Sequence, residues 1–138
     1  MFIIIRSDRD DCCVEPQTSM RANVLARTQF EGFHYWADAP DEVAFLRQLH
    51  RHIFHVEVVI PVEHDDRDIE IILLKRTLDE YCSSLTEKIK TEGWSCERIA
   101  STLALMLANK YNFDSCVVQV LEDNENGGTV IYDRKESI

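Results

Sequence analysis

Apolar and polar residues alternate along several segments of the chain, and this alternation predicts β-strands. The two segments between residues 20 and 65 are the longest, and the second of them, at 51–62, has the strongest strand pattern. The sequence Asn126-Gly127-Gly128 predicts a hairpin turn between the last two strands. The predicted strands cover residues 1–6, 23–36, 51–62, 115–122 and 129–132.

Elsewhere the apolar residues recur every three or four positions, which is the spacing of an amphipathic helix. This pattern predicts a helix over residues 69–90, and Gly93 is expected to end it. Ser95 can cap a second helix, with Glu97 in its first turn, where a negative charge is favourable. The two helices therefore follow one another directly, between the predicted strands at 51–62 and 115–122.

A short helix is expected between the two longest strands. Pro40 suits the first helical position, Asp38 can act as its cap, and the helix should run to about Leu46. The order of elements predicts an α+β fold, in which an antiparallel sheet carries two helices on one face. We expect one domain over residues 1–138, with an N-terminal arm at 1–22 and a core at 23–133.

The charge balance excludes one class of function. The chain has 138 residues, with 15 Lys and Arg against 25 Asp and Glu, and a formal net charge of −10. Nucleic-acid affinity comes largely from cationic side chains, so a broad nucleic-acid-binding surface is not expected. The apolar run at the N-terminus is too short for a signal-peptide core or a membrane span. We therefore expect a cytoplasmic protein with no membrane partner.

The cysteines indicate a reducing compartment. There are five of them, an odd number, and none forms a Cys-x-x-Cys pair. Free thiols, mostly buried, are the expectation. Cys12 and Cys13 are adjacent and suggest a metal site, but neighbouring side chains in an extended chain point in opposite directions.

Three of the five histidines lie close together in the sequence, at the start of one predicted strand. His50 and His52 face the same side of that strand, roughly 7 Å apart, and His55 faces the other side. This spacing lets two imidazoles bind one Zn²⁺ ion. His34, at the end of the preceding strand, supplies a third ligand if the two strands are neighbours. The alternative is a cluster of surface or hydrogen-bonded histidines without a metal.

Five segments in the same order resemble one known family. They read Phe-x-x-x-His, Leu-His-x-His-x-aromatic-x-Val, an acidic helix start followed by Leu-Lys, Ser-x-Glu-x-x-Ala, and Val-x-Val-x-Glu. The family is the tunnelling-fold family of 6-pyruvoyl- and 6-carboxy-tetrahydropterin synthases, and the resemblance spans roughly residues 24–132. The matching residues are 30–34, 49–56, 70–75, 95–100 and 118–122.

The resemblance implies a specific site. His34, His50 and His52 would be zinc ligands, and Glu122 would anchor the amino-pyrimidinone edge of a pterin or purine-like ring, with Glu97 as a further ligand-binding residue. A carboxylate suits that edge because it can accept two parallel N–H bonds. The resemblance also implies a four-stranded tunnelling fold whose sheets close into an oligomeric barrel, a trimer or hexamer. In that barrel Glu122 would face the histidines across a subunit boundary.

The chain also departs from the family. Family enzymes have a cysteine shortly before His-x-His, where residues 44–48 have none, and a Leu-Asp-His segment between the helices that is missing here. Cys82 lies near the missing segment, but on the apolar side of its helix, so it is expected to be buried. A thiol nucleophile needs a neighbouring base, and the ordinary synthase reaction is therefore not expected. His55, Glu70 and Tyr81 are the remaining candidates for proton transfer.

Three hypotheses follow from the sequence. The first is a zinc-dependent, lyase-like enzyme of pterin or 7-deazapurine metabolism. The second is a catalytically inactive protein, of viral or mobile-element origin, that binds or sequesters a nucleotide-like small molecule. The third is a purely structural tunnelling-fold subunit. Tyr35 and Trp36 follow His34 directly, and their aromatic side chains are candidates for the wall of a ligand pocket.

Overall fold

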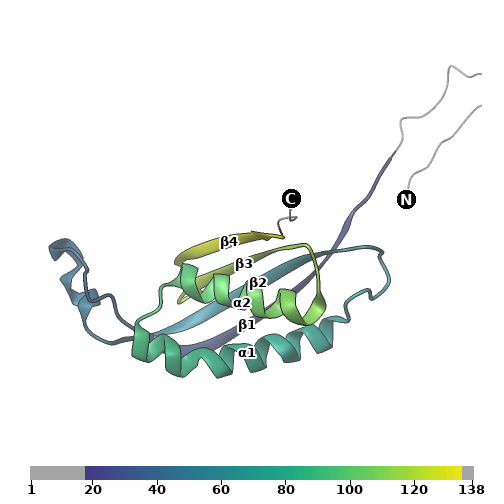
Figure 1. Ribbon diagram of the computed structural model, residues 1–138. Helices are drawn as coiled ribbons and strands as arrows, with labels where there is room; N and C mark the ends of the chain where they lie inside the picture. The colour runs from purple at the N-terminus through teal and green to yellow at the C-terminus, as the bar shows by residue number, and fades with distance from the viewer. Residues whose placement is uncertain (1–17, 135–138) are drawn as a thin grey trace, which may run out of the picture.

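The computed structural model describes residues 18–134, so the strand predicted at 1–6 and the Cys12-Cys13 pair lie outside the described residues. The other strands and helices occur in the predicted order (Figure 1). They are β1 (Ala22–His34), the 3₁₀ helix η2 (Asp41–Arg47), β2 (His50–Val62), α1 (Ile71–Glu92), α2 (Cys96–Tyr111), β3 (Ser115–Glu122) and β4 (Asn126–Asp133).

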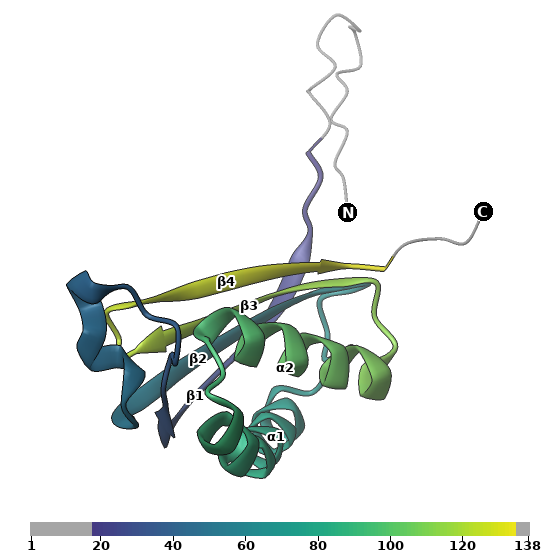
Figure 2. The same cartoon turned by 60° about the vertical axis from the view of Figure 1, so that its left-hand side comes forward.

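The four strands form one antiparallel sheet in the order β1-β2-β3-β4. Both α-helices lie on the same face of it, with α1 over β1 and α2 over β3 and β4 (Figure 2). The expected α+β class is therefore confirmed. No helix in the described range 18–134 has the length and apolar character that a membrane crossing requires.

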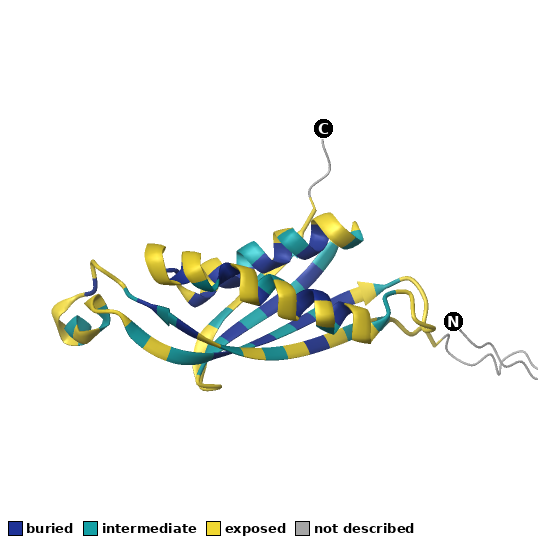
Figure 3. Ribbon diagram, turned by 90° about the horizontal axis from the view of Figure 1, so that it is seen from below, coloured by how far each residue is buried: buried dark blue, intermediate teal, exposed yellow. Residues whose placement is uncertain are grey.

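The hydrophobic core fills the space between the helices and the sheet. Even-numbered residues of β2 point inward, and Phe54, Val58 and Ile60 are fully buried there. The buried stripes of α1 and α2, which include Leu78 and Leu103, face them, while the outer sides of both helices are exposed (Figure 3). Burying side chains of this size stabilises the fold by roughly 1.5–3 kcal/mol each.

The helix ends follow the chemistry of their sequence. Glu70 caps α1 because its side chain accepts a hydrogen bond from the Leu73 N–H, and Gly93 ends the helix with a left-handed φ of 66°. A side chain at position 93 would collide with Tyr35, since a β-carbon there would lie 2.5 Å from the Tyr35 carbonyl oxygen. Ser95 caps α2 through the Arg98 N–H, as predicted. These caps hold the connection between α1 and α2 against the end of β1.

Two local predictions are wrong. The hairpin turn lies at residues 123–125 instead of 126–128, and Asp123 and Asn124 adopt its left-handed conformation with φ of 53° and 61°. Asp and Asn tolerate that conformation better than most residues, so the turn does not need the glycines. The short helix η2 is a 3₁₀ helix with Pro40 at its N-cap position and no side-chain cap, so Asp38 does not play the expected role.

The glycines expected in the turn instead belong to β4. A β-carbon at Gly127 would lie 1.8 Å from the Val120 carbonyl oxygen, and one at Gly128 would lie 2.8 Å from Cγ of Glu97. Both positions therefore favour glycine because neighbouring atoms approach closely, and not because of turn geometry.

The other face of the sheet carries no helix within the described residues. Four apolar residues lie side by side across all four strands, because each is the register partner of the next: Leu25, Val59, Val117 and Ile131. The two on the edge strands are the most exposed, Leu25 at 46% and Ile131 at 70%. The next row along the sheet is polar and contains the ion pair of Arg27 and Glu57, at 2.7 Å. We call the four apolar residues the outer apolar row.

Candidate metal centre

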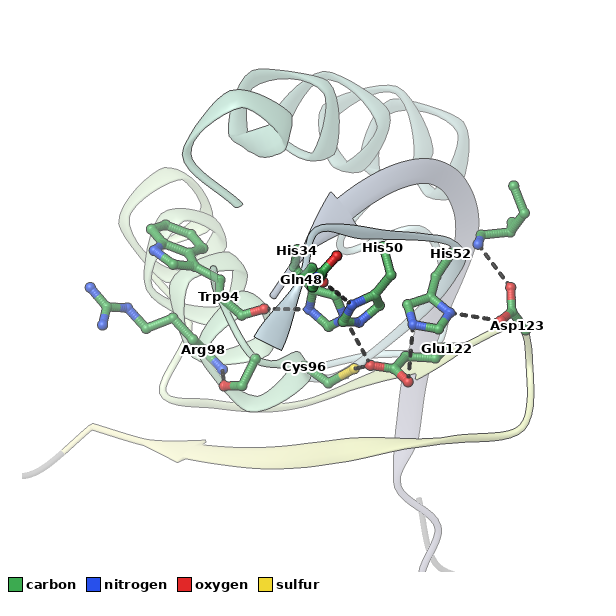
Figure 4. A network of polar contacts seen from close by, with 11 residues as sticks. His34, Gln48, His50, His52, Trp94, Cys96, Arg98, Glu122 and Asp123 are labelled. Carbon is green, nitrogen blue, oxygen red and sulfur yellow. Dashed lines mark hydrogen bonds and ion pairs between the residues drawn. The ribbon is translucent and has the colours of Figure 1, made fainter. Parts of the chain in front are cut away.

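Three histidines meet at the end of the sheet where β1 ends and β2 begins. His34 is the register partner of His50, and His52 is two residues further along β2, opposite Gly32. All three side chains lie on the helix-covered side of the sheet, and one ring nitrogen from each lies within 4.8 Å of the others (Figure 4). β1 and β2 are neighbours, so the condition for His34 to join His50 and His52 is met.

Each imidazole is held in place through its Nδ1 atom. The Nδ1–H of His34 donates to the Trp94 carbonyl at 2.7 Å, and that of His50 donates to the Gln48 carbonyl at 2.8 Å. The Nδ1–H of His52 donates to a carboxylate oxygen of Asp123 at 2.7 Å (Figure 4). Metal-binding histidines in proteins are commonly oriented by such acceptors on their second nitrogen.

These hydrogen bonds leave the three Nε2 atoms facing one another. The Nε2 atoms of His34 and His52 are buried and make no aligned hydrogen bond. A buried nitrogen lone pair without a partner costs free energy, which a bound cation would recover. Three imidazole nitrogens converging in this way suit a divalent transition metal, so the residues fit a metal ion.

Glu122 lies against the histidines of its own chain. Its carboxylate oxygens are 3.1 Å from Nε2 of His34 and 3.4 Å from Nε2 of His52. Burial lowers the pKa of His34, but Glu122 and the Trp94 carbonyl outweigh it, so the pKa is raised above 6.5. Contact with His34 lowers the pKa of Glu122, although burial opposes this effect. The expectation that Glu122 would meet the histidines only across a subunit boundary is therefore wrong, because β3 pairs with β2 at this point.

A cavity of about 440 Å³ opens beside the three histidines. Glu122 and His50 form part of its lining, and Tyr35 and Trp36 contribute aromatic surface, as the sequence suggested. The start of α2 provides a further wall, which includes Glu97. Two of the predicted metal ligands, His34 and His50, thus share one cavity with the predicted ring-binding residues Glu122 and Glu97, whereas His52 does not line it.

The thiols of the described residues are buried and free. Cys82 is 2% exposed, as predicted, and burial raises its pKa to about 12. Cys96 lines the cavity, with Sγ 3.8 Å from a carboxylate oxygen of Glu122. Burial, followed by the negative charges of Glu122 and Glu97, raises the pKa of Cys96 to about 12 as well. Neither thiol is therefore ionised near neutral pH.

The proposed proton-transfer groups lie away from the cavity. His55 is on the outer face of the sheet, where it is the register partner of Gln29. The Glu70 side chain caps α1, and Tyr81 packs against the core. None of the three lines the cavity beside the histidines. Between residues 18 and 134, the three histidines form the one group of potential ligands close enough to hold a metal ion.

Asp123 is a site residue that sequence reasoning missed. It follows Glu122 directly, and its second carboxylate oxygen accepts a hydrogen bond from the Ile53 N–H at 3.0 Å. Its own N–H donates to the Ile53 carbonyl at 2.8 Å. The sequence does show an Asp at the end of a strand that pairs with the histidine strand. It does not show where the Asp123 side chain points, because this depends on the left-handed turn.

A comparison of the sequence with models of known protein families finds no match, and a comparison with curated proteins finds none either.

Proposed function

We propose that this protein binds a pterin or purine-like small molecule beside a histidine-bound zinc ion. One observation carries the proposal: His34, His50 and His52 bring one ring nitrogen each within 4.8 Å of the others, and Glu122 and Glu97 line the cavity beside them. The resemblance to tunnelling-fold tetrahydropterin synthases supports this choice of ligand and metal. A bound zinc ion supplies Lewis acidity toward an oxygen of the ligand.

The two glutamates supply the recognition of the ring. A carboxylate accepts paired N–H bonds, so it favours rings with a 2-amino group next to a ring N–H, as in pterins and guanine. An adenine-type ring lacks that pair of donors. Tyr35 and Trp36 offer aromatic surface for the face of a planar ligand. Glu97 is exposed at the start of α2, where it can reach a ligand in the cavity.

Binding, and not the usual synthase reaction, is the activity that we propose. The segment of 44–48 that should carry the family's nucleophilic thiol has no cysteine. Cys96 does line the cavity, but its pKa is raised to about 12 by burial and by neighbouring carboxylates, so it stays protonated. A protonated thiol is a poor nucleophile and a poor proton acceptor.

We also propose that the protein assembles as a ring, a trimer or hexamer, through its sheets. The outer apolar row lies on the face of the sheet that no helix of the described residues covers, and two of its members, Leu25 and Ile131, are exposed in the single chain. Both β1 and β4 are edge strands, and exposed edges favour pairing with another chain. Closing the sheets of several chains into a barrel would bury the outer apolar row and would pair the exposed edges of β1 and β4.

The experiment is a ligand-binding titration with matched rings. Zinc-loaded protein is mixed with neopterin, guanosine and adenosine, and binding is measured by calorimetry. We expect neopterin or guanosine to bind, adenosine to bind at least about tenfold more weakly, and Glu97→Gln to reduce this difference. Glu63→Gln, an exposed acid after β2, is the control and should leave it unchanged. Equal binding of all three rings, or none, contradicts the proposal.

A further inference from the structure

The positions of Glu122, His34 and His52 raise an electrostatic problem. Because Nδ1 of both histidines donates to a fixed acceptor, the neutral rings present lone pairs at Nε2. Glu122 places carboxylate oxygens, which are also acceptors, 3.1 and 3.4 Å from these nitrogens. Acceptors at this separation repel one another unless a positive charge lies between them.

A proton on Nε2 of His34 or a bound metal ion supplies such a charge, and the separations are compatible with a metal ion. Zinc binds imidazole nitrogen and carboxylate oxygen at about 2.0–2.2 Å, so two ligand atoms of a tetrahedral site lie roughly 3.3–3.5 Å apart. The separations between Glu122 and the two Nε2 atoms are close to that value. Glu122 therefore already stands about where a fourth ligand would stand.

We infer that Glu122 is the fourth ligand of the metal ion in the ligand-free protein, completing a site of three histidines and one glutamate. The inference rests on the proposed function, since it concerns the same metal. The resemblance gives Glu122 only the role of ring anchor, so the role of metal ligand is new for this residue. The remaining ring contact at the start of α2 is then Glu97.

This assignment has a consequence for ligand binding. The side chain of Glu122 is 31% exposed, and it lines the cavity as well as the histidine cluster. A small molecule bound in the cavity would therefore lie against this carboxylate. With Glu122 as the fourth ligand, an oxygen of a bound small molecule would reach the metal only in place of Glu122, whose carboxylate would then be free to accept N–H bonds from the ring.

Cobalt titration of metal-free protein tests the inference, because Co²⁺ replaces zinc and its visible spectrum reports the ligands. We expect one Co²⁺ per chain in the wild type, and an altered spectrum with at least about tenfold weaker binding in Glu122→Gln. Loss of a mere outer-shell partner already costs ~10–100-fold in affinity. Glu63→Gln, an exposed acid after β2 that does not line the cavity, is the control and should match the wild type.

The outcomes separate the two claims. A wild type that binds no metal overturns the proposed metal site itself. A wild type that binds Co²⁺, with Glu122→Gln giving the same affinity and spectrum, overturns the assignment of Glu122 and leaves the histidine site standing. X-ray absorption of zinc-loaded wild type gives an independent reading: carboxylate scattering beside three imidazoles supports the inference, and three imidazoles with water alone contradict it.

Discussion

The carboxylate of Asp123 accepts a hydrogen bond from Nδ1 of His52 at 2.7 Å, across the boundary between two strands. The same carboxylate accepts the Ile53 N–H, and the Asp123 N–H donates to the Ile53 carbonyl, so three hydrogen bonds hold this residue. His52 is consequently fixed with its proton on Nδ1. Its Nε2 lone pair is directed at the other two histidines.

Replacing Asp123 should weaken metal binding without unfolding the protein. Asp123→Asn keeps a residue that tolerates the left-handed φ of 53°, but it removes the charged acceptor for His52. We expect a loss of about 10–100-fold in zinc affinity. ¹⁵N NMR of the metal-free variant should show a larger share of the tautomer protonated at Nε2. Asp65→Asn, in the exposed turn after β2, is the control, and an unchanged affinity in Asp123→Asn would refute the role.

The buried thiols should resist alkylation in the folded protein. Burial raises the pKa of Cys82 to about 12 and that of Cys116 to about 11, so the reactive thiolate is scarce at pH 8. Peptide mapping after iodoacetamide treatment should find both residues unmodified, and modified fully in urea. Rapid labelling of Cys82 under native conditions would show that α1 does not pack as described.

The two glycines at the start of β4 should differ in their tolerance of alanine. Gly127→Ala puts a β-carbon 1.8 Å from the Val120 backbone oxygen, which cannot move without breaking the β3–β4 pairing. We expect a loss of about 3 kcal/mol in the free energy of unfolding, near the upper end of ordinary substitutions. At Gly128→Ala the closest contact is with the flexible side chain of Glu97, at 2.8 Å, and the backbone nitrogen of Glu97 lies at 3.4 Å, so this change should cost less. Urea denaturation of both variants measures the order, and the reverse order would contradict this account of β4.

Assembly through the sheets should depend on the outer apolar row. Ile131→Asp places a charge on its most exposed member, at 70% exposure, and should reduce the mass measured by light scattering toward the 16.1 kDa of one chain. Thr129→Asp changes a neighbouring outward position on the same strand, in the polar row, and serves as the control. A wild type that is already 16.1 kDa at micromolar concentration would contradict the proposed ring.

The strands and helices were predictable because their signals are local. The alternation in β2 and the three-to-four spacing in α1 each reflect burial of one face, and Gly93 and Ser95 mark the helix ends through backbone chemistry. The position of the hairpin turn was not predictable, because two adjacent segments, 123–125 and 126–128, both contain residues typical of turns. Asp123 and Asn124 tolerate the left-handed conformation that the turn requires, so the turn forms there. Gly127 lies inside β4, where its backbone approaches Val120 too closely for a side chain.

The site was predictable only in part. His50 and His52 share a face by the alternation of a strand, and His34 joins them once β1 pairs with β2. The acceptors that orient the rings were not predictable, since two of them are backbone carbonyls, at Gln48 and Trp94, whose positions depend on the folded chain. A carbonyl is present at every residue and leaves no mark in the sequence.

The most direct test of the account is the metal content of two histidine variants of the same strand. His52 points into the cluster, and His55 lies on the opposite face of β2. Elemental analysis of proteins purified with zinc should find about one ion per chain in the wild type and in His55→Ala, and far less than one in His52→Ala. Full zinc stoichiometry in His52→Ala, or none in the wild type, would contradict the assignment of the metal to His34, His50 and His52.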